Sequence, residues 1–185
     1  MPSLADDQAY FCRGVGELEE YLLSNELFWP LSARPSLPRL TVGGLLLSQL
    51  RLQARTSSVK ATGAVTQAEE DLIKLRGIWR AAWEHKATQE VHARLARWQD
   101  FLMEGQRSPD QRAKDYPHEV QGRVILQILK REAPGLARAW TRLEALDQVV
   151  KAAWLPGPLI WEMDLSVSFP GDEYWFLYGK LKPRE

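Results

Sequence analysis

Apolar side chains recur every three or four positions from Thr66 to Glu104, a stretch without proline. This spacing is typical of one helix face, so the sequence predicts a single long helix over residues 66–104. Because the mean step exceeds 3.6 residues, the apolar stripe drifts around the helix. We therefore expect its two halves to face different neighbours, or the helix to bend near residues 84–90. The stripe consists of Leu72, Leu75, Trp79, Trp83, Ala87, Val91, Leu95, Trp98 and Leu102.

Both ends of this predicted helix carry boundary signals. Thr66 and Glu69 have the spacing of a capping box, in which each side chain accepts a hydrogen bond from the backbone amide of the other residue. Gly105 and Pro109 follow the other end, and both residue types are common just after a helix. We expect the helix to begin at Thr66, where loss of the cap would cost about 1 kcal/mol.

Three segments precede the long helix. Residues 3–24 show helical spacing, and Gly14 and Gly16 indicate either a close approach by another helix, which we favour, or two shorter helices. Residues 25–40 contain three prolines, which excludes a regular helix. Residues 41–55 carry leucines on more than one face and predict a central helix.

Helical spacing resumes after the long helix. Ser108 followed by Pro109 predicts a short helical turn, and Pro117 and Pro134 each predict the start of a further helix. We expect these helices and the long helix to share one continuous core. Its predicted members include Leu72, Leu75, Trp79, Val91, Leu95, Trp140, Leu143 and Val150.

The period of the pattern changes near the C-terminus. Apolar and polar residues alternate from Trp161 to Phe169, which is typical of a strand with one buried face. A proline-glycine turn follows, and residues 174–181 form a second, aromatic strand pattern. We therefore expect a β-hairpin over about residues 159–181.

These patterns predict a mainly α protein. The expected architecture is a multi-helix bundle organised around the long helix, with a C-terminal β-hairpin. With 185 residues, of which 45% are hydrophobic, the chain can bury a core without disulfides. We expect a helical bundle domain over residues 1–155 and a β-hairpin appendage over residues 156–185, packed on that domain or on a partner.

Composition limits the location and the classes of partner. Equal numbers of basic and acidic side chains, 24 of each, argue against nucleic-acid binding, because such proteins are usually basic. Cys12, the single cysteine, cannot form an internal disulfide, and the N-terminus lacks the features of a signal peptide. The most apolar run, residues 42–47, is too short to span a membrane. The sequence therefore predicts a cytoplasmic protein without a membrane partner.

Charge is uneven along the first 60 residues. Residues 1–30 hold six acids against one arginine, whereas residues 31–60 hold five basic side chains and no acid. We expect these neighbouring segments to pack together through complementary charge, in preference to forming a dedicated anion site.

Two histidines on the long helix form a candidate metal site. His85 and His92 lie seven positions apart and could share one helix face, from which two imidazoles can bind a transition metal. No acid or cysteine completes the ligand set on the same turns, and a metal site needs more than two ligands. The alternative is a solvated face with incidental histidines.

Two tryptophans on the same helix form a candidate ligand site. Trp79 and Trp83 lie one helical turn apart beside Arg76 and Arg80. They could line a pocket for a flat apolar ligand or stack on single-stranded bases. The alternative is that the tryptophans belong to the helical core.

No nucleophile elbow, phosphate loop, zinc-protease helix or kinase signature occurs in the sequence, which favours a non-enzymatic protein without a cofactor. The leading interpretation is an interaction or assembly module that forms a homodimer or docks a protein partner through its hairpin, since an isolated hairpin is only marginally stable. The alternative is a small-molecule binding protein with an aromatic-lined cavity between helices. The predicted interface residues are Trp161, Met163, Leu165, Tyr174, Phe176 and Tyr178.

Overall fold

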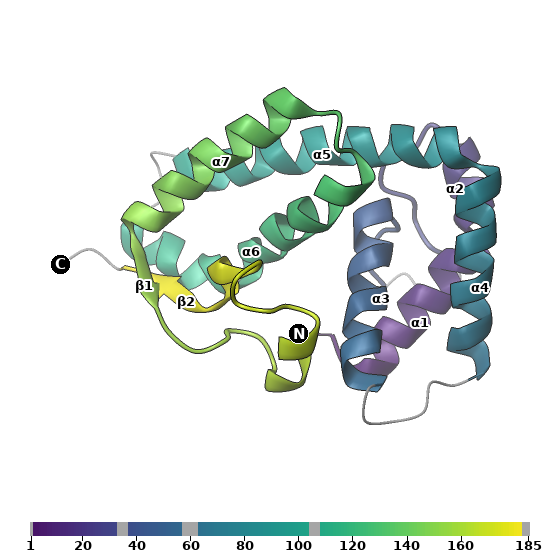
Figure 1. Cartoon of the computed structure of the whole chain (residues 1–185), viewed down its shortest axis with the longest axis horizontal. Helices are drawn as coiled ribbons and strands as arrows, with labels where there is room; N and C mark the ends of the chain where they lie inside the picture. The colour runs from purple at the N-terminus through teal and green to yellow at the C-terminus, as the bar shows by residue number, and fades with distance from the viewer. Residues whose placement is uncertain (1, 33–36, 57–62, 104–107, 183–185) are drawn as a thin grey trace. The chain divides into compact units, whose positions relative to one another are not determined.

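The computed structural model describes residues 2–32, 37–56, 63–103 and 108–182, which are mainly α-helical (Figure 1). A short antiparallel hairpin lies near the C-terminal end, so the predicted fold class, mainly α with a C-terminal β-hairpin, is confirmed. In chain order the elements are α1 (Leu4–Gly16), α2 (Leu18–Leu23), α3 (Val42–Thr56), α4 (Gly63–Ile78), α5 (Arg80–Met103), α6 (Pro109–Glu132), α7 (Ala137–Ala152), β1 (Trp154–Pro156), the 3-10 helices η1 (Met163–Val167) and η2 (Trp175–Leu177), and β2 (Gly179–Leu181).

The predicted long helix over residues 66–104 is two helices, α4 and α5. They meet at a corner at Trp79 (Figure 1), although the Trp79 amide still donates to the Leu75 carbonyl at 2.9 Å. Gly77, with its low helix propensity, is the nearest sequence signal for this corner. α5 continues without a break through residues 84–90, where a bend was the alternative expectation.

The contacts divide the chain into two compact units, Met1–Glu90 and Val91–Glu185. The boundary falls inside α5, so the two halves of this helix belong to different units. This confirms the expectation, drawn from the drifting apolar stripe, that the two halves face different neighbours. The predicted division into a domain over residues 1–155 and an appendage over residues 156–185 stays a prediction.

Most residues predicted for the core are buried, and they divide between the two units. Leu75 and Trp79, near the corner, are the two that are only half-buried. None of the helices in the described ranges combines the length and the apolar character needed to cross a membrane. The buried members of the predicted core are Leu72, Val91, Leu95, Trp140, Leu143 and Val150.

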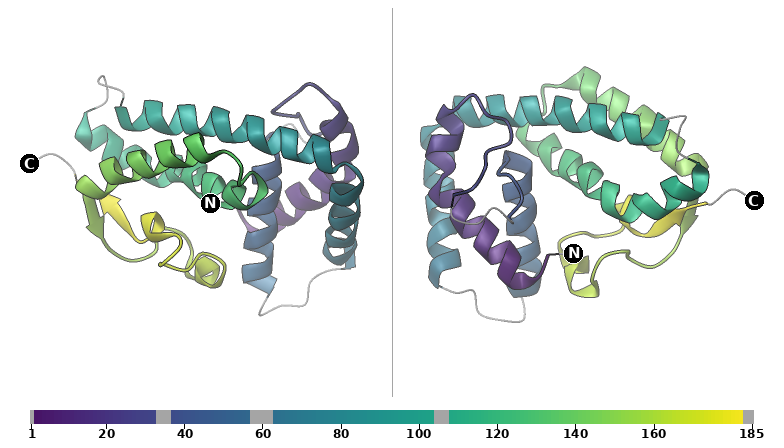
Figure 2. Two further views of the ribbon diagram at one scale, coloured as in Figure 1. Left: turned by 45° about the horizontal axis from the view of Figure 1, so that its top comes forward. Right: turned by 180° about the vertical axis from the view of Figure 1, so that it is seen from behind.

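In the first unit, α1 packs against both α3 and α4 (Figure 2). The single helix predicted over residues 3–24 is interrupted at Glu17, so this segment forms two shorter helices. Gly14 is nonetheless a close approach, because a Cβ there would lie 2.9 Å from methyl carbons of Leu40 and Leu45. Both explanations offered for the glycines therefore apply, and the favoured close approach is confirmed at Gly14.

Gly14→Ala should destabilise the protein, whereas Gly122→Ala should stabilise it. The methyl group of alanine at position 14 must displace two packed leucine side chains, and such overpacking typically costs about 1–3 kcal/mol. At Gly122, inside α6, a Cβ meets nothing within 4 Å, so alanine contributes about 0.5–1 kcal/mol through helix propensity. Urea denaturation of both variants measures the effects. Shifts of the two midpoints in the same direction would contradict the close approach.

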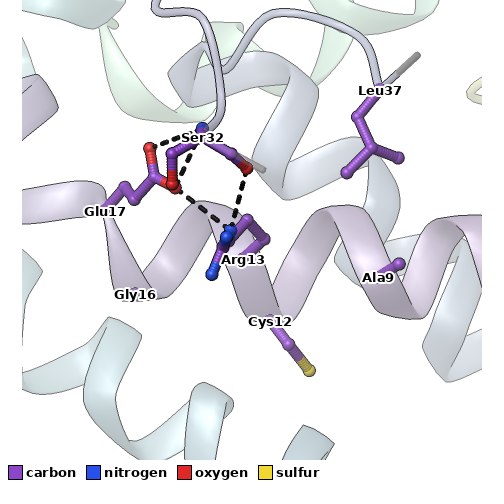
Figure 3. A pocket seen from close by; sticks show the side chains of 7 residues that line it. All are labelled: Ala9, Cys12, Arg13, Gly16, Glu17, Ser32 and Leu37. Atoms are coloured by element: carbon purple, nitrogen blue, oxygen red, sulfur yellow. Dashed lines mark hydrogen bonds and ion pairs between the residues drawn. The ribbon is translucent and has the colours of Figure 1, made fainter. Parts of the chain in front are cut away.

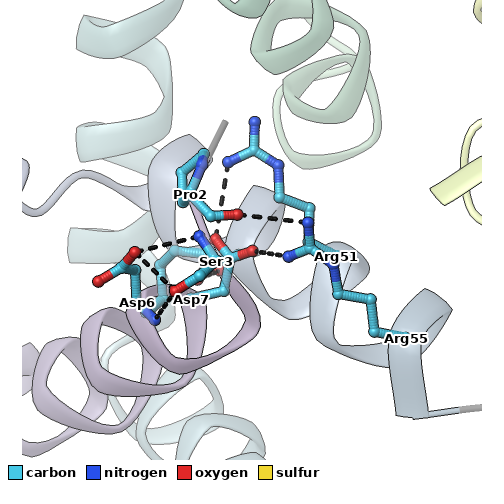
Figure 4. A network of polar contacts seen from close by, with 8 residues as sticks. Pro2, Ser3, Asp6, Asp7, Arg51 and Arg55 are labelled. Atoms are coloured by element: carbon cyan, nitrogen blue, oxygen red, sulfur yellow. Dashed lines mark hydrogen bonds and ion pairs between the residues drawn. The ribbon is translucent and has the colours of Figure 1, made fainter. Parts of the chain in front are cut away.

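A buried ion-pair cluster connects α1 to α3 (Figure 4). Asp7 accepts a hydrogen bond from Arg55 Nη1 at 2.6 Å, and Arg51 Nη1 lies 3.7 Å from its other carboxylate oxygen. Burial raises the pKa of Asp7 to about 6, although both guanidinium groups act to lower it. Arg55 also donates to the Pro2 carbonyl at 3.3 Å. The contact joins the acidic and basic segments that were expected to pack together.

The helix cap predicted at Thr66 is wrong. α4 begins at Gly63, so Thr66 is an exposed residue inside the helix. Glu69 instead accepts a hydrogen bond from the Gln53 side chain at 3.2 Å. Threonine and glutamate are also tolerated inside a helix, so their spacing alone does not mark a boundary.

Ser3→Ala should destabilise the protein by about 1 kcal/mol, whereas Thr66→Ala should not. Ser3 caps α1 in a complete capping box, because its hydroxyl accepts from the Asp6 amide at 3.2 Å and its own amide donates to the Asp6 carboxylate at 3.1 Å. Thermal denaturation of the two variants separates them. An unchanged midpoint for Ser3→Ala would show that this capping box contributes nothing.

In the second unit, a short link joins α6 to α7. Ser108 caps α6 by accepting a hydrogen bond from the Gln111 amide at 3.1 Å, so the predicted start signal is confirmed. The helix then continues through Pro117, and the predicted start of a new helix there is wrong. Tyr116 and Val120, on either side, are fully buried, and their packing offsets the hydrogen bond that a proline removes.

The C-terminal hairpin is shorter than predicted: its first strand uses other residues, and its second strand is only the last three residues of the predicted one. β1 pairs antiparallel with β2, with Trp154 opposite Leu181 and Leu155 opposite Lys180. The strand predicted over residues 161–169 contains the 3-10 helix η1 instead, and much of the second predicted strand is η2. The hairpin is confirmed, but the predicted strand boundaries are wrong.

Candidate functional site

The C-terminal segment turns most of its apolar side chains inward. Trp161, Leu165 and Phe169, four positions apart, are 6%, 0% and 0% exposed. Met163 and Val167, which alternate with them, are 71% and 72% exposed. A strand would place all five side chains on one face. The tighter turns of η1 direct every second one outward, and the alternating pattern in the sequence does not distinguish these two arrangements.

The other predicted interface residues are also turned largely inward. Tyr174 and Phe176 are 3% and 1% exposed. Tyr178 is half-buried, and its hydroxyl donates to the Phe169 carbonyl at 2.8 Å. Burial, with the neighbouring Glu173 carboxylate, raises the pKa of Tyr174 to about 12. Of the six predicted residues, only Met163 is exposed, and the interface role of the set stays a prediction.

A series of aromatic contacts links this segment to α5 and α6. Consecutive ring centroids lie between 5.1 and 6.2 Å apart, mostly edge to face. Such pairs each contribute about 0.5–1.5 kcal/mol beyond their buried area. The series runs through Phe101, Trp98, Tyr116, Trp154, Trp175, Phe176, Tyr174, Phe169 and Trp161.

A buried polar network fixes the same segment to α6 and α7. Arg123 on α6 donates to both carboxylate oxygens of Asp147 on α7, at 2.8 and 2.7 Å. Its guanidinium carbon also lies 4.2 Å from the ring centre of Phe176. The Tyr116 hydroxyl donates to the Phe176 carbonyl at 2.7 Å, and burial raises the pKa of Tyr116, which keeps it a donor. Sequence reasoning missed this network, although Arg123 lies among the apolar positions of its helix.

The residues of the candidate aromatic ligand site differ in how far they are buried. Trp83 is 1% exposed, and the guanidinium carbon of Arg76 lies 5.4 Å from its ring centre. Trp79 is half-buried at the corner, and Arg80 is exposed and pairs with Glu84 at 2.8 Å. Trp83 is therefore a core residue, as the alternative interpretation held. A ligand role for the four residues stays a prediction.

Both histidines of the candidate metal site, His85 and His92, are exposed on α5. Among the described residues, no three or more histidine, cysteine, aspartate or glutamate side chains are grouped so that they could hold a metal ion. Metal binding by this pair stays a prediction that lacks additional ligands.

Sequence reasoning also missed two buried charges on α5. Lys86 donates to the carbonyls of Ser24 and Glu26, at 2.9 and 2.6 Å, just beyond the C-terminal end of α2. The Glu90 carboxylate accepts from the Gly43 amide at 2.7 Å, in the first turn of α3. A cation near a helix C-terminus and an anion near a helix N-terminus are both favoured by the helix dipole. Burial lowers the pKa of Lys86, although the Glu26 carboxylate acts to raise it.

Two hollows adjoin α1 and share Cys12 and Gly16 in their lining, and Figure 3 shows the residues that line the first of them. One hollow, of about 500 Å³, lies between α1 and the chain near Ser32 and Leu37. The other, of about 480 Å³, lies between α1 and α4. Both volumes are in the range of small-molecule sites. The lining residues are Ala9, Cys12, Arg13, Gly16, Glu17, Ser32 and Leu37 for the first hollow, and Cys12, Val15, Gly16, Ala64, Gln67, Ala68, Asp71, Lys74 and Leu75 for the second.

Glu17 organises the polar side of the first hollow. Its carboxylate accepts from the indole of Trp29 at 3.0 Å and from the amide and hydroxyl of Ser32 at 3.1 and 2.5 Å, and it pairs with Arg13 at 3.2 Å. Burial raises the pKa of Glu17, but the hydrogen bonds from Ser32 and Trp29 and the charge of Arg13 outweigh it and lower the pKa. Burial raises the pKa of Cys12, so its thiol stays protonated and weakly nucleophilic.

The fold and these surfaces define a class, a mainly α protein with a C-terminal β-hairpin and open hollows along its first helix. No model of a known protein family matches the chain, and neither a curated protein nor a solved structure matches it. Function must therefore be inferred from the geometry of the described residues.

Proposed function

We propose that this protein is a non-enzymatic interaction module that self-associates through its C-terminal segment. The supporting observation is the outward position of Met163 and Val167, the first and last residues of η1, which are 71% and 72% exposed on a segment whose other apolar side chains are largely buried. Exposed apolar side chains that lie together are typical of docking surfaces. The single cysteine, which permits no internal disulfide, supports a cytoplasmic location.

The backbone that presents this pair is held in place. The Leu165 amide donates to the Glu162 carbonyl at 3.0 Å, and the Phe169 amide donates to the Leu165 carbonyl at 3.2 Å. The Trp161 and Phe169 rings contact each other edge to face at 5.1 Å. A surface that is already ordered loses little conformational entropy when it binds, which favours association.

A second copy of the chain is the partner that we propose. In a two-fold contact, the same apolar pair meets its own counterpart, so one exposed patch supplies both sides of the interface. Two side chains cover much less than the roughly 1,000 Å² that a stable interface buries. Neighbouring polar residues must therefore contribute, and we expect the association to be weak and dependent on concentration.

Light scattering of the full chain over a range of concentrations tests this proposal. The double variant Met163→Lys, Val167→Lys should remain monomeric where the unaltered protein forms dimers. Ile73→Lys is the matched control, because Ile73 is 73% exposed on α4, in the other unit. Point variants are preferable to a chain ending at residue 155, since truncation would also remove the buried rings of Phe169 and Phe176. A strictly monomeric protein at high concentration, or equal losses in variant and control, would contradict the proposal.

The hollows along α1 favour a second candidate, a small-molecule binding protein. They adjoin at Cys12 and Gly16, and the polar groups of the first hollow are already ordered around Glu17. The lining is not aromatic, so the site differs from the cavity expected from the sequence. Its mixed charge, with Arg13 and Glu17 on one side and Asp71 and Lys74 on the other, suits a polar ligand.

Native mass spectrometry of the purified protein tests this candidate. Gly16→Leu should abolish retention of a bound small molecule, because a Cβ at Gly16 meets nothing within 4 Å and a larger side chain can extend over both hollows. Gly77→Leu is the matched control, since a Cβ there also meets nothing within 4 Å and Gly77 does not line either hollow. The candidate fails if nothing is retained, or if Gly16→Leu retains as much as the control.

A further inference from the structure

The structure describes three side chains that contain sulfur, and they differ in how easily an oxidant can reach and attack them. Met163 is 71% exposed and Met103 is 59% exposed. Cys12 is half-buried, and its thiol donates a hydrogen bond to the Ala64 carbonyl at 3.7 Å. Burial also raises the pKa of Cys12, so little of the thiolate that reacts with peroxides is present at neutral pH. Met163 is therefore the most accessible sulfur among the described residues.

Buried neighbours keep the Met163 side chain at the surface. Trp161 and Leu165, two positions before and after it, are 6% and 0% exposed. The Trp161 ring packs edge to face on Phe169 with centroids 5.1 Å apart, and the Leu165 amide donates to the Glu162 carbonyl at 3.0 Å. A rotation of η1 that hid Met163 would expose these buried side chains, which is unfavourable. The free chain therefore cannot withdraw the thioether from solvent.

A peroxide converts an exposed methionine into methionine sulfoxide. The sulfur attacks one peroxide oxygen, so that an S–O bond forms while the O–O bond breaks. With hydrogen peroxide, the sulfur is oxidised by two electrons, and the other oxygen leaves as water with both protons. The product carries a polar oxygen in place of an apolar thioether. Burying that oxygen in an apolar contact without a hydrogen-bond donor is unfavourable.

We propose that Met163 is a modification site for peroxides, and that its oxidation weakens the association of two copies of the chain. The inference rests on the self-association proposed above, in which Met163 and Val167 supply the apolar part of the contact. The dimer would bury the sulfoxide oxygen of each copy, whereas the monomer leaves it in water. Oxidation therefore favours the monomer, and association in turn shields the sulfur from the oxidant.

The effect of oxidation is partial and reversible. Val167 has no group that a peroxide oxidises under the same conditions, so one member of the apolar pair is retained. Methionine sulfoxide reductases convert sulfoxides back to thioethers with electrons from a dithiol. The oxidised Met163 of a monomer remains at the surface, where such an enzyme can reach it. Supplying the reductase and a dithiol should therefore restore association.

Met103 provides an internal reference for the first experiment. It is the last residue of α5, in the same unit as Met163, and is not part of the proposed contact. The full chain is treated with dilute hydrogen peroxide below and above the concentration at which light scattering detects dimers, and peptide mass spectrometry follows both methionines. Oxidation of Met163 relative to Met103 should slow several-fold above that concentration. An unchanged ratio in a protein that forms dimers would overturn the inference.

Three variants assign the effect to Met163. Complete oxidation should raise the dissociation constant of the unaltered dimer by about 10-fold or more, equivalent to about 1.4 kcal/mol. Met163→Leu keeps an apolar side chain without sulfur, so its dimer should withstand the same treatment. Met163→Gln places a polar group there and should associate as weakly as the oxidised protein. Met103→Leu is the matched control and should remain as sensitive to peroxide as the unaltered protein.

The possible failures are distinguishable. Dimers that persist when Met163 is fully oxidised, loss of the Met163→Leu dimer on oxidation, or association that does not return after Met163 is reduced would overturn this inference alone. A protein that is monomeric before oxidation would overturn the proposed self-association, and this inference with it. Intact-mass measurement without reductant identifies any dimer linked through Cys12, which is not counted as association.

Discussion

Replacing Asp147 with alanine should lower the free energy of unfolding by about 3–5 kcal/mol, because it leaves the buried Arg123 guanidinium without a counter-charge. The Arg123 and Asp147 side chains are 5% and 12% exposed, and two hydrogen bonds of 2.8 and 2.7 Å join them. Arg123 also packs on the Phe176 ring, so its displacement would loosen the C-terminal segment. Urea denaturation followed by tryptophan fluorescence measures the loss.

Two controls make this prediction specific. Glu144→Ala removes an acid three positions earlier on α7, where Glu144 pairs with Lys130 at 3.6 Å on the surface, and it should cost no more than about 1 kcal/mol. The double variant Arg123→Met, Asp147→Leu removes both charges and should recover most of the stability that Asp147→Ala loses, because it leaves no unpaired buried ion. If Asp147→Ala costs no more than Glu144→Ala, the buried pair does not stabilise this unit.

Glu90→Ala should destabilise the protein by about 3 kcal/mol, because it removes a buried charged acceptor and leaves an amide of α3 unsatisfied. Glu90 is fully buried, and its carboxylate accepts from the Gly43 amide at 2.7 Å. Glu90→Gln retains an acceptor of similar shape but loses the charge that favours the helix N-terminus, so its effect should be intermediate. Chemical denaturation of both variants measures the graded loss.

Glu84→Ala is the matched control, because Glu84 lies on the same helix and its contact with Arg80 is on the surface. It should leave the denaturation midpoint nearly unchanged. The role of Glu90 would be contradicted if Glu90→Ala and Glu90→Gln had equal effects, or if Glu90→Ala were as mild as the control.

Helical periodicity predicted most of the fold, because amphipathic spacing is a local property of the chain. The apolar positions around Val91, Leu95, Leu143 and Val150 are buried as their spacing indicated, and the cap at Ser108 was visible as serine followed by proline. The corner at Trp79 was not predicted, because no proline marks it and the i to i+4 hydrogen bonding continues through it.

The C-terminal segment shows where local patterns become ambiguous. Alternation from Trp161 to Phe169 fits a strand with one buried face, and it fits equally a turn-rich segment that buries every second apolar residue. The choice depends on which hydrogen-bond partners the backbone finds. In the structure, β2 pairs with Trp154–Pro156, a segment with no strand signal of its own.

Partners for the buried charges come from distant parts of the chain, and that distance explains why the candidate sites were only partly predicted. Lys86 and Glu90, four positions apart, have the spacing of an ordinary surface ion pair on a helix. Their partners, at the end of α2 and in the first turn of α3, lie 47 to 62 positions away in the sequence. Periodicity within the sequence determined which segments are helical and which side of each is apolar, because both depend on neighbours within a few residues. Tertiary packing alone decided where the helices turn, which charges are buried against helix ends, and which apolar residues remain exposed, because each of these depends on contacts between segments far apart in the chain.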